Sequence, residues 1–425
     1  MQEAFLHYLW KHKKLWKDTL VSTQGLPITI LNVGQHNHNS GPDFFNAHIR
    51  IGEQLWAGTV EIHVNSSDWY LHNHETDVAY DNVILHVVWE EDVEVFRANN
   101  TVIPTLEIQH KVSQELLEYY QNLFAQKSRW INCETDISTI DEFLKKNWLE
   151  RLYFERLERK SKVIENLLVT SKNDWEAVLF KMLAKNFGLK VNGDAFLSIA
   201  NSFEFSLLRK QQTSLLGIEA LLLGQAKLLE IALEQGYYIT LQNEYKFLKQ
   251  KFKLSDKGII KPSFFRLRPS NFPTVRLAQL AKLYFKEAHL FSKLINANTI
   301  DEISQLFEIE LHAFWNTHYS FAKESRAKVK RLTPTFINLI IINTIVPLKY
   351  SYAKYSKTII YDTLLDLMSK LKSEKNSIVS KFADLQLVSN SAIDSQGLIQ
   401  LKTEYCEKNK CLQCAIGSAL LNRNM

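Results

Sequence analysis

Two acidic residues and a histidine on adjacent predicted strands form the strongest chemical pattern in this sequence of 425 residues. Asp43 ends the tripeptide G-P-D, and Glu61 and His63 are two positions apart in an alternating apolar run. Side chains two apart in a strand share a face of the sheet. Carboxylate oxygens are the ligands that Mg²⁺ and Mn²⁺ prefer, and such an ion can polarise a phosphoryl oxygen and supply a hydroxide nucleophile. His63 would orient the water or the phosphate.

A short hairpin is expected to bring these three residues together. We predict that Ile51 lies opposite Leu55, and this register puts Asp43 opposite His63. Residues opposite one another are about 5 Å apart and diagonal neighbours roughly 7–8 Å. Asp43, Glu61 and His63 therefore converge on one patch in this prediction. The alternative is a surface hairpin with ordinary charged side chains.

The four cysteines form a second pattern. Cys406, Cys411 and Cys414 are closely spaced near the C-terminal end of the sequence, and Cys133 is far from them. Three thiolates do not complete a tetrahedral site, so a four-cysteine site requires the two segments to meet. Such a site would hold Zn²⁺ or a [4Fe–4S] cluster. The alternative is a set of reduced thiols on a terminal helix.

A basic stretch points to a polyanion. Residues 246–286 contain eleven Lys and Arg residues and a single acid, Asp256, with aromatic residues between them. Basic groups neutralise phosphates, and aromatic rings stack on unpaired bases. The residues that we expect to contact nucleic acid are Lys261, Arg266, Arg268 and Arg276, and a second basic cluster at residues 323–331 could extend this surface. The alternative is a solvated face.

The spacing of apolar residues, which predicts the elements that position these residues, changes near residue 112 from that of strands to that of helices. We predict a helix at residues 2–20 and then strands at residues 26–33, 44–51, 55–64, 83–89 and 102–108, the fourth of them central and buried. From residue 114 the apolar spacing is helical, with Gly and Pro between the segments. We therefore expect an α+β chain, with an α/β domain at residues 1–112 and an all-helical domain at residues 113–425 that carries the basic patch and the cysteines.

Composition fits a soluble protein. Hydrophobic residues make up 46% and charged residues 23%. The first 150 residues hold 11 basic and 21 acidic residues, and the remainder holds 40 basic and 25 acidic residues. The first part of the chain is therefore acidic overall and the rest is basic. The most apolar stretch, residues 336–348, is shorter than the roughly 20 residues of a bilayer span and is expected to be a buried helix. We see no signal peptide, so the sequence predicts a cytoplasmic protein without a membrane partner.

The order helix, strand, Pro-Asp, hairpin and Glu-x-basic resembles the PD-(D/E)XK nuclease superfamily. The resemblance implies a restriction-endonuclease-like fold for the first domain. It matches Asp43 to the Pro-Asp aspartate, Glu61 to the second acid and His63 to the position usually held by Lys. An acid on a helix often completes such sites, which implies Glu3 as a further metal ligand. The histidine departs from the usual pattern, although some repair endonucleases of this superfamily use histidine there.

Some nucleases of this superfamily are also similar in their cysteines. In members from helicase–nuclease repair complexes and CRISPR adaptation, one distant Cys and three clustered ones hold an iron–sulfur cluster. There the lone Cys precedes the nuclease motif, whereas Cys133 follows it.

More of the chain resembles one bacterial family, the domain of unknown function 2851 (DUF2851) family. The resemblance runs almost end to end and supplies no activity. It is carried by N-S-G-P-D-F (residues 39–44), V-E-I-H (60–63), D-W with H-N-H (68–69 and 72–74), Y-D-N-V-I-L-H-V-V (80–88), R-P-S-N-F-P (268–273) and the terminal cysteines.

These observations predict a metal-dependent nuclease that hydrolyses phosphodiester bonds of nucleic acid. A second hypothesis is a nucleic-acid-binding protein with an inactive site. A third is a metal-dependent hydrolase of a small substrate, which would use the same carboxylates with His72 and His74. These two histidines could instead contact phosphate or belong to an exposed polar turn.

Overall fold

The computed structural model describes residues 1–15, 19–37, 39–125 and 129–422. They form two units by their contacts. The sheet unit comprises Met1–Trp148, Leu385–Leu387 and Leu401–Met425, and the helical unit comprises Leu149–Asp384 and Val388–Gln400. The boundary thus differs from the expected one after residue 112, because residues 113–148 and the segment with three of the cysteines pack with the sheet. The prediction of an α+β chain, a sheet region followed by many helices, is confirmed.

The sheet unit contains a mixed sheet with the strand order β1-β2-β4-β5-β6-β7, and β3 pairs with β4. Strands β5 and β6, and β6 and β7, run parallel, and the other pairings are antiparallel. Its elements are α1 (Glu3–Lys11), β1 (Leu20–Val21), β2 (Pro27–Asn32), β3 (Gln35–His36), β4 (Phe44–Ile51), β5 (Gln54–Asn65), α2 (Asp68–Leu71), η1 (His74–Thr76), η2 (Val78–Tyr80), β6 (Val83–Glu90), β7 (Thr105–Glu107), η3 (Gln109–Lys111), α3 (Gln114–Ala125), η4 (Ile137–Thr139), η7 (Leu401–Cys406), η8 (Cys411–Gln413) and α19 (Ala415–Leu421).

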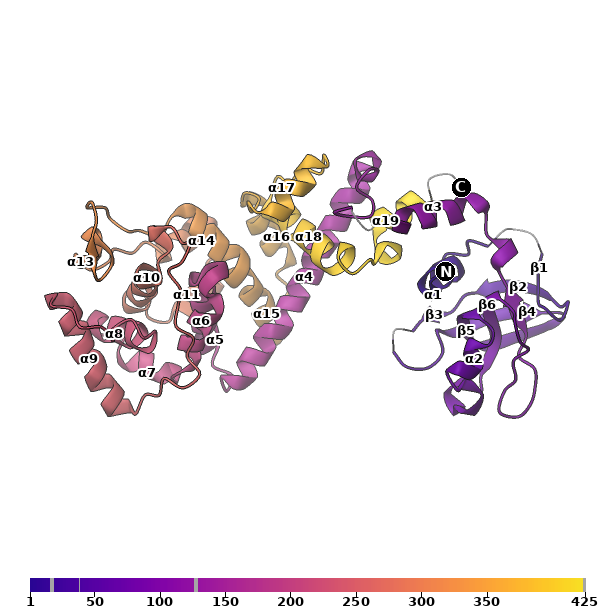
Figure 1. Cartoon of the computed structure of the whole chain (residues 1–425), viewed down its shortest axis with the longest axis horizontal. Coiled ribbons are helices and arrows are strands. Elements are labelled where there is room, and N and C mark those ends of the chain that lie inside the picture. The colour runs from indigo at the N-terminus through magenta and orange to yellow at the C-terminus, as the bar shows by residue number, and fades with distance from the viewer. Residues whose placement is uncertain (16–18, 38, 126–128, 423–425) are drawn as a thin grey trace. The chain divides into compact units, whose positions relative to one another are not determined.

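Helix α1 packs against β5 and supplies one side of the core of this unit (Figure 1). Phe5, Leu6 and Leu9 are fully buried with Val60 and Ile62 of β5. Strand β6 lies between β5 and β7 and is almost entirely buried, as predicted for a central strand. A strand in a parallel sheet is covered by other elements on both faces. The continuous apolar sequence of β6 suits this burial.

The register of the β4–β5 hairpin differs from the prediction. Ile51 lies opposite Gln54, not Leu55, because the turn has two residues and begins at Gly52 with a φ of +61°. A two-residue turn requires positive φ, which glycine adopts without strain. A bulge near Asn46 then shifts the ladder again. Extending the pairing beyond the bulge puts Asp43 opposite Glu61, two positions from His63, the partner that we predicted.

The helical unit is built from helices around one continuous core. Its elements are α4 (Glu142–Thr170, of which the first turns belong to the sheet unit), α5 (Trp175–Phe187), α6 (Leu189–Asn201), α7 (Phe205–Lys210), α8 (Leu215–Gln225), α9 (Gly236–Phe252), η5 (Pro269–Asn271), α10 (Pro273–Lys286), α11 (Leu290–Asn296), α12 (Ile300–Leu306), α13 (Phe314–Thr317), β8 (His318–Ser320), β9 (Lys323–Glu324), α14 (Pro334–Ile340), η6 (Ile341–Ile345), α15 (Val346–Ser356), α16 (Tyr361–Lys370), α17 (Ser377–Asp384) and α18 (Ala392–Gln400).

The most apolar part of this unit is a core helix. Pro334–Ser356, which comprises α14, η6 and α15, is the stretch of the described chain that is long and apolar enough to cross a membrane, and 78% of its most apolar window is buried in the structure. Burial of this kind is how an apolar helix packs in the core of a soluble protein. The expected burial of residues 336–348 is therefore confirmed in its main part.

A buried carboxyl group makes the stability of the helical unit depend on pH. Glu219 on α8 is 1% exposed and accepts hydrogen bonds from the Tyr237 hydroxyl and, at 3.2 Å, from Trp315 Nε1. Burial outweighs these hydrogen bonds and raises the pKa of Glu219 to about 7. The folded unit therefore holds this proton over a pH range in which the unfolded chain releases it.

Replacing Glu219 with Gln is expected to remove a loss of stability that the wild type shows as the pH rises. A carboxyl with a raised folded-state pKa stabilises the fold at acidic pH, and this contribution falls between about pH 4.5 and 7. A shift of this size corresponds to on the order of 3 kcal/mol. Urea unfolding of both proteins at pH 5 and pH 8 measures the difference, and equal pH dependence of the two would contradict the prediction.

Candidate metal centre

Asp43 and Glu61 interlock at the point where strand β4 ends. The ladder between β4 and β5 ends at Phe44, whereas β5 continues to Asn65. The backbone N–H of Asp43 donates to Glu61 Oε2 at 3.1 Å, and that of Ile62 donates to Asp43 Oδ2 at 3.0 Å. The Asp43 carboxylate thus takes the place of a further strand residue, and the two acids lie side by side at an open strand edge.

Helix α1 adds a histidine and a third acid to this edge. His7 Nε2 lies 3.1 Å from Asp43 Oδ2 and 3.6 Å from Glu3 Oε1. Burial alone lowers the pKa of His7, but the hydrogen bonds and charges of Asp43 and Glu3 together raise it to about 9. The histidine is therefore a cation at neutral pH when no metal is bound, and it holds the two carboxylates together.

Two further imidazoles lie at the other oxygen of Glu61, and a third lies beside one of them. His63 Nε2 and His74 Nε2 each lie 3.4 Å from Glu61 Oε1. His72 Nδ1 lies 3.2 Å from His63 Nε2. His63 is buried, whereas His72 is exposed, so this side of the cluster opens to solvent. Burial raises the pKa of Glu61 to about 7, against the effect of the nearby His74.

A reversal of the chain after α2 positions His72 and His74. Asn73 between them has a φ of +59°, which turns the backbone so that both rings reach His63. The ring of His74 stacks on Tyr80 with 3.7 Å between centroids. Trp69, buried beneath, holds the segment through a hydrogen bond from Nε1 to a backbone carbonyl. Aromatic packing therefore fixes two histidines that would otherwise be mobile in a surface turn.

His86 on β6 orients His63 from behind. His63 Nδ1 lies 2.9 Å from His86 Nε2, and both rings are buried. Burial lowers the pKa of His63 to about 3 and that of His86 well below its usual value. One N–H lies between the two neutral rings in such a contact. In the tautomer in which His63 Nδ1 donates it to His86, the Nε2 of His63 keeps a lone pair that can bind a cation.

The arrangement offers two sets of metal ligands. The ligand atoms of His63, His72 and His74 lie within 4.8 Å of one another, and so do those of Glu3, His7 and Asp43. Glu61 lies between the two sets, because one of its oxygens faces Asp43 and the other faces the histidines. Pairs of cations bound in this way act in phosphoryl-transfer enzymes, where they bind the attacking and the leaving oxygen.

Sequence reasoning named six of these residues, four for the metal site and two as histidines that could join it or contact phosphate. The structure brings Asp43, Glu61, His63 and Glu3 together, and His72 and His74 join them. His7 was missed, although its spacing of four from Glu3 puts both on one face of the first helix. The partner of the buried His86 is the His63 ring.

All four cysteines line one small pocket in the sheet unit. Cys133 meets Cys406, Cys411 and Cys414 there, and none of them forms a disulfide. Burial raises the pKa of each thiol. Cys406 ends the π-helical turn η7, and such turns are frequent at functional sites. The two distant segments therefore meet, as a four-cysteine site requires.

A single zinc ion would require the sulfur atoms of its cysteine ligands to lie close together. A tetrahedral Zn²⁺ with bonds of about 2.3 Å needs its sulfurs about 3.8 Å apart. Among the described residues, the sets of three ligand atoms within 4.8 Å of one another contain no cysteine. Asn132 donates to Cys411 Sγ at 3.3 Å, a hydrogen bond of the kind that tunes an iron–sulfur cluster.

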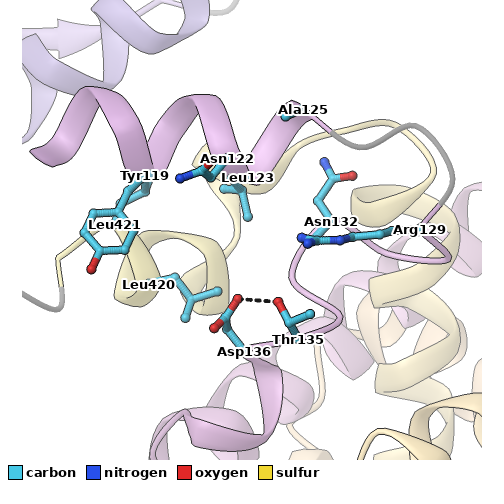
Figure 2. Close-up of a pocket in the computed structure, with 10 residues that line it drawn as sticks. All are labelled: Tyr119, Asn122, Leu123, Ala125, Arg129, Asn132, Thr135, Asp136, Leu420 and Leu421. Atoms are coloured by element: carbon cyan, nitrogen blue, oxygen red, sulfur yellow. Dashed lines mark hydrogen bonds between the residues drawn. The ribbon is translucent and has the colours of Figure 1, made fainter.

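A wider cavity of about 340 Å³ lies next to the cysteine pocket, and Asn132 lines both. Figure 2 shows its wall of side chains from α3, the segment at Arg129–Asp136 and α19, with Thr135 hydrogen-bonded to Asp136 at 2.6 Å. Its charged lining residues are Arg129 and Asp136, and neither belongs to the metal centre. This cavity is thus separate from the predicted metal centre.

The basic residues predicted to contact nucleic acid lie in the helical unit and differ in exposure. Lys261, Arg266 and Arg268 are exposed, whereas Arg276 on α10 is 7% exposed. The backbone places Arg266 in the left-handed region with a φ of +58°. Three of the four side chains can therefore meet a polyanion at the surface, and the fourth lies inside.

A family model described as protein of unknown function (DUF2851) matches residues 3–377 of the chain. No curated protein and no solved structure matches. The resemblance to DUF2851 drawn from the motifs is confirmed, and the resemblance to the PD-(D/E)XK superfamily stays a prediction.

Proposed function

This chain belongs to the DUF2851 family of proteins of unknown function, and we propose that it is a metal-dependent nuclease that hydrolyses phosphodiester bonds of nucleic acid. The observation that carries the proposal is the convergence of three carboxylates and four imidazoles from α1, β4, β5 and the segment after α2. Groups this dense are costly without a cation, because buried like charges and desolvated imidazoles oppose one another.

The residues of the centre divide into ligands and orienting groups. Asp43 and Glu61, with Glu3 as a third acid, would hold Mg²⁺ or Mn²⁺, which prefer carboxylate oxygens. Bound cations would polarise the phosphoryl oxygens and lower the pKa of a coordinated water. His63 would orient water or phosphate, and His86 holds its ring in place. His72, on the exposed side, would be the first of these side chains to meet a substrate.

The choice of metal follows from the imidazoles. Mg²⁺ rarely takes nitrogen ligands, whereas Mn²⁺ and Zn²⁺ accept imidazole. An ion bound by His63, His72 and His74, with His63 as a ligand and not as an orienting group, would therefore be Mn²⁺ in preference to Mg²⁺. The carboxylates of Glu3 and Asp43 would suit either ion.

A cleavage assay tests the function. We expect the purified chain to cut single- or double-stranded DNA or RNA with Mn²⁺, to be slower with Mg²⁺ and to be inactive with EDTA. Glu61→Ala should abolish cleavage, because this side chain lies between both ligand sets. Salt should weaken binding steeply if the exposed basic residues neutralise phosphates. Equal cleavage by wild type and Glu61→Ala would refute the proposal.

A second candidate function is favoured by the three histidines. Three imidazoles, or two imidazoles with one carboxylate, are ligand sets typical of catalytic Zn²⁺, so a zinc hydrolase of a small substrate would use residues of the same centre. Tight Zn²⁺ binding with no salt-dependent affinity for nucleic acid would indicate this function. Salt-dependent binding without metal-stimulated cleavage would instead indicate an inactive nucleic-acid-binding protein.

We further propose that the four cysteines hold a [4Fe–4S] cluster, with Zn²⁺ as the alternative. Support comes from the meeting of Cys133 with the C-terminal three in one pocket and from the hydrogen bond that Asn132 donates to Cys411 Sγ. Such a group would join the C-terminal segment to the segment that contains Cys133. Since free thiols persist in reducing compartments, we also propose a cytoplasmic location.

A further inference from the structure

A cavity of about 600 Å³ in the helical unit is lined by five basic residues. They come from three places in the chain: Arg268 precedes η5, Arg276 is on α10, and Lys328, Lys330 and Arg331 precede α14. Of the described residues that line it, none is acidic. The volume is that of a small-molecule pocket, for which about 300–1,000 Å³ is usual.

Arg276 is the key side chain of this cavity. Its guanidinium donates to Asn271 Oδ1 at 2.7 Å and to Gln279 Oε1 at 3.0 Å, and it stacks on the Phe336 ring at 3.7 Å. These partners are neutral, and the buried Nε has no hydrogen-bond partner. Burial lowers the pKa of Arg276 only to about 10, so the group stays charged at neutral pH.

A buried cation without a counter-charge is unusual. Within the described part of the chain, no carboxylate forms an ion pair with Arg276 or with Arg268. A charge of this kind is costly unless an anion comes from outside the fold. The planar fork of arginine matches phosphate oxygens in two parallel hydrogen bonds, and here amide side chains already fix the orientation of that fork.

The rest of the lining suits a larger ligand than a bare anion. Lys328 and Arg268 stand at the exposed side, and Lys330 is held by backbone carbonyls with its ammonium 4.1 Å from the Tyr319 ring centroid. The wall beside Arg276 is apolar and includes Val275. The cavity therefore presents positive charge at one part and an apolar surface at another, which matches a phosphate joined to a sugar and a base.

We propose that this cavity binds a nucleotide through its phosphate, either a free mononucleotide or the phosphorylated end of a nucleic-acid strand. Arg276 would take the phosphate inside the cavity, and Arg268 and Lys328 would contact it from the exposed side. The site does not depend on the proposed hydrolysis, because it lies in the helical unit and uses none of the metal-centre residues.

Binding measurements on the full chain in EDTA test this site while any metal-dependent cleavage is suppressed. The probes are AMP against adenosine, and a short 5′-phosphorylated oligonucleotide against the same oligonucleotide with a 5′-hydroxyl. We expect the phosphorylated probe to bind at least about tenfold more tightly in one pair or both, since a charge-assisted hydrogen bond is worth roughly that factor. Preference within the AMP pair alone identifies a free nucleotide, and preference within the oligonucleotide pair alone identifies a strand end.

Variants distinguish binding in the cavity from binding to the basic surface around it. Arg268→Gln and Lys328→Gln change exposed side chains and should each weaken the phosphorylated probe about tenfold. Lys257→Gln removes an exposed charge of the same basic stretch that does not line the cavity, and it should leave the affinity within about twofold. Arg276→Lys keeps the charge and should still lose affinity, because it loses the fork. The proposal is overturned if neither probe pair shows a phosphate preference, or if Lys257→Gln weakens binding as much as Arg268→Gln.

Discussion

Replacing Asp43 with Asn is expected to lower metal-stimulated phosphodiester cleavage at least about a hundredfold. The side chain accepts the Ile62 N–H and lies 3.1 Å from His7 Nε2. Asparagine keeps an oxygen for the Ile62 hydrogen bond, so the strand edge should survive. It removes the negative charge that holds a cation, and the loss should exceed the ten- to hundredfold effect typical of residues that only support metal ligands.

The measurement is the initial cleavage rate at saturating Mn²⁺ beside the Mn²⁺ affinity by calorimetry. Glu53→Gln is the matched control, since it removes an acid from the turn at the other end of the same hairpin. We expect that control to behave like wild type. Unchanged cleavage by the Asp43→Asn protein, with normal far-UV circular dichroism, would show that the carboxylate takes no part in the reaction.

The Asp43→Asn variant has a second readout, because it removes a negative charge next to His7. Asp43 is the first of the groups that raise the pKa of His7 to about 9 against burial. Without that carboxylate the histidine should titrate at lower pH in the metal-free protein. An NMR titration of the imidazole detects this change independently of any activity. The titration therefore shows whether a loss of metal binding comes from the missing carboxylate or from a misfolded strand edge.

Replacing Cys406 with Ala is expected to remove the bound metal and to lower the melting temperature by roughly 10 °C. A metal held by the four cysteines would join the segment at Cys133 to the C-terminal segment, so it would stabilise only the folded arrangement. A loss of a few kcal/mol moves the melting temperature of a unit of about 150–250 residues by this amount. Cys133→Ala should have the same effect, although it lies far away in the chain.

Iron and zinc analysis of anaerobically prepared protein, with an absorbance spectrum near 400 nm, measures the first part. Gln413→Ala is a suitable control, because Gln413 is exposed between two of the cysteines and does not line their pocket. Metal content that persists in both cysteine variants would contradict a four-cysteine site. Zinc without iron in the wild type would show that the four cysteines hold Zn²⁺ and not an iron–sulfur cluster.

The spacing of apolar residues predicted where the strands of the sheet lie, but it did not predict which residues pair between them. The alternation of β5 and the continuous apolar sequence of β6 indicated both strands within one or two residues of their observed bounds. The two-residue turn at Gly52 and the bulge near Asn46 each moved the pairing by one position. Asp43 came to lie opposite Glu61 for this reason, and the predicted cluster survived because diagonal neighbours on a sheet are also close.

Helix ends in the second half were less predictable than helix positions. The sequence predicted Gly and Pro between the helical segments, whereas α8 ends at Gln225 and the next helix, α9, begins at Gly236 itself. Glycine was taken as a breaker, but at the first position of a helix it meets no steric conflict. Such boundaries depend on what the helix packs against, and the local pattern does not encode that.

The sequence by itself determined which chemistry the chain holds: acids and imidazoles in the first hundred residues, four thiols that could close one site, and a basic stretch behind them. Only the tertiary structure decided which of these groups meet. Packing of α1 on β5 brings His7 to Asp43, the turn at Asn73 brings His72 and His74 to His63, and burial sets Arg276 inside a cavity. These contacts join residues from different elements, so they follow from how faces pack together and not from spacing along the chain.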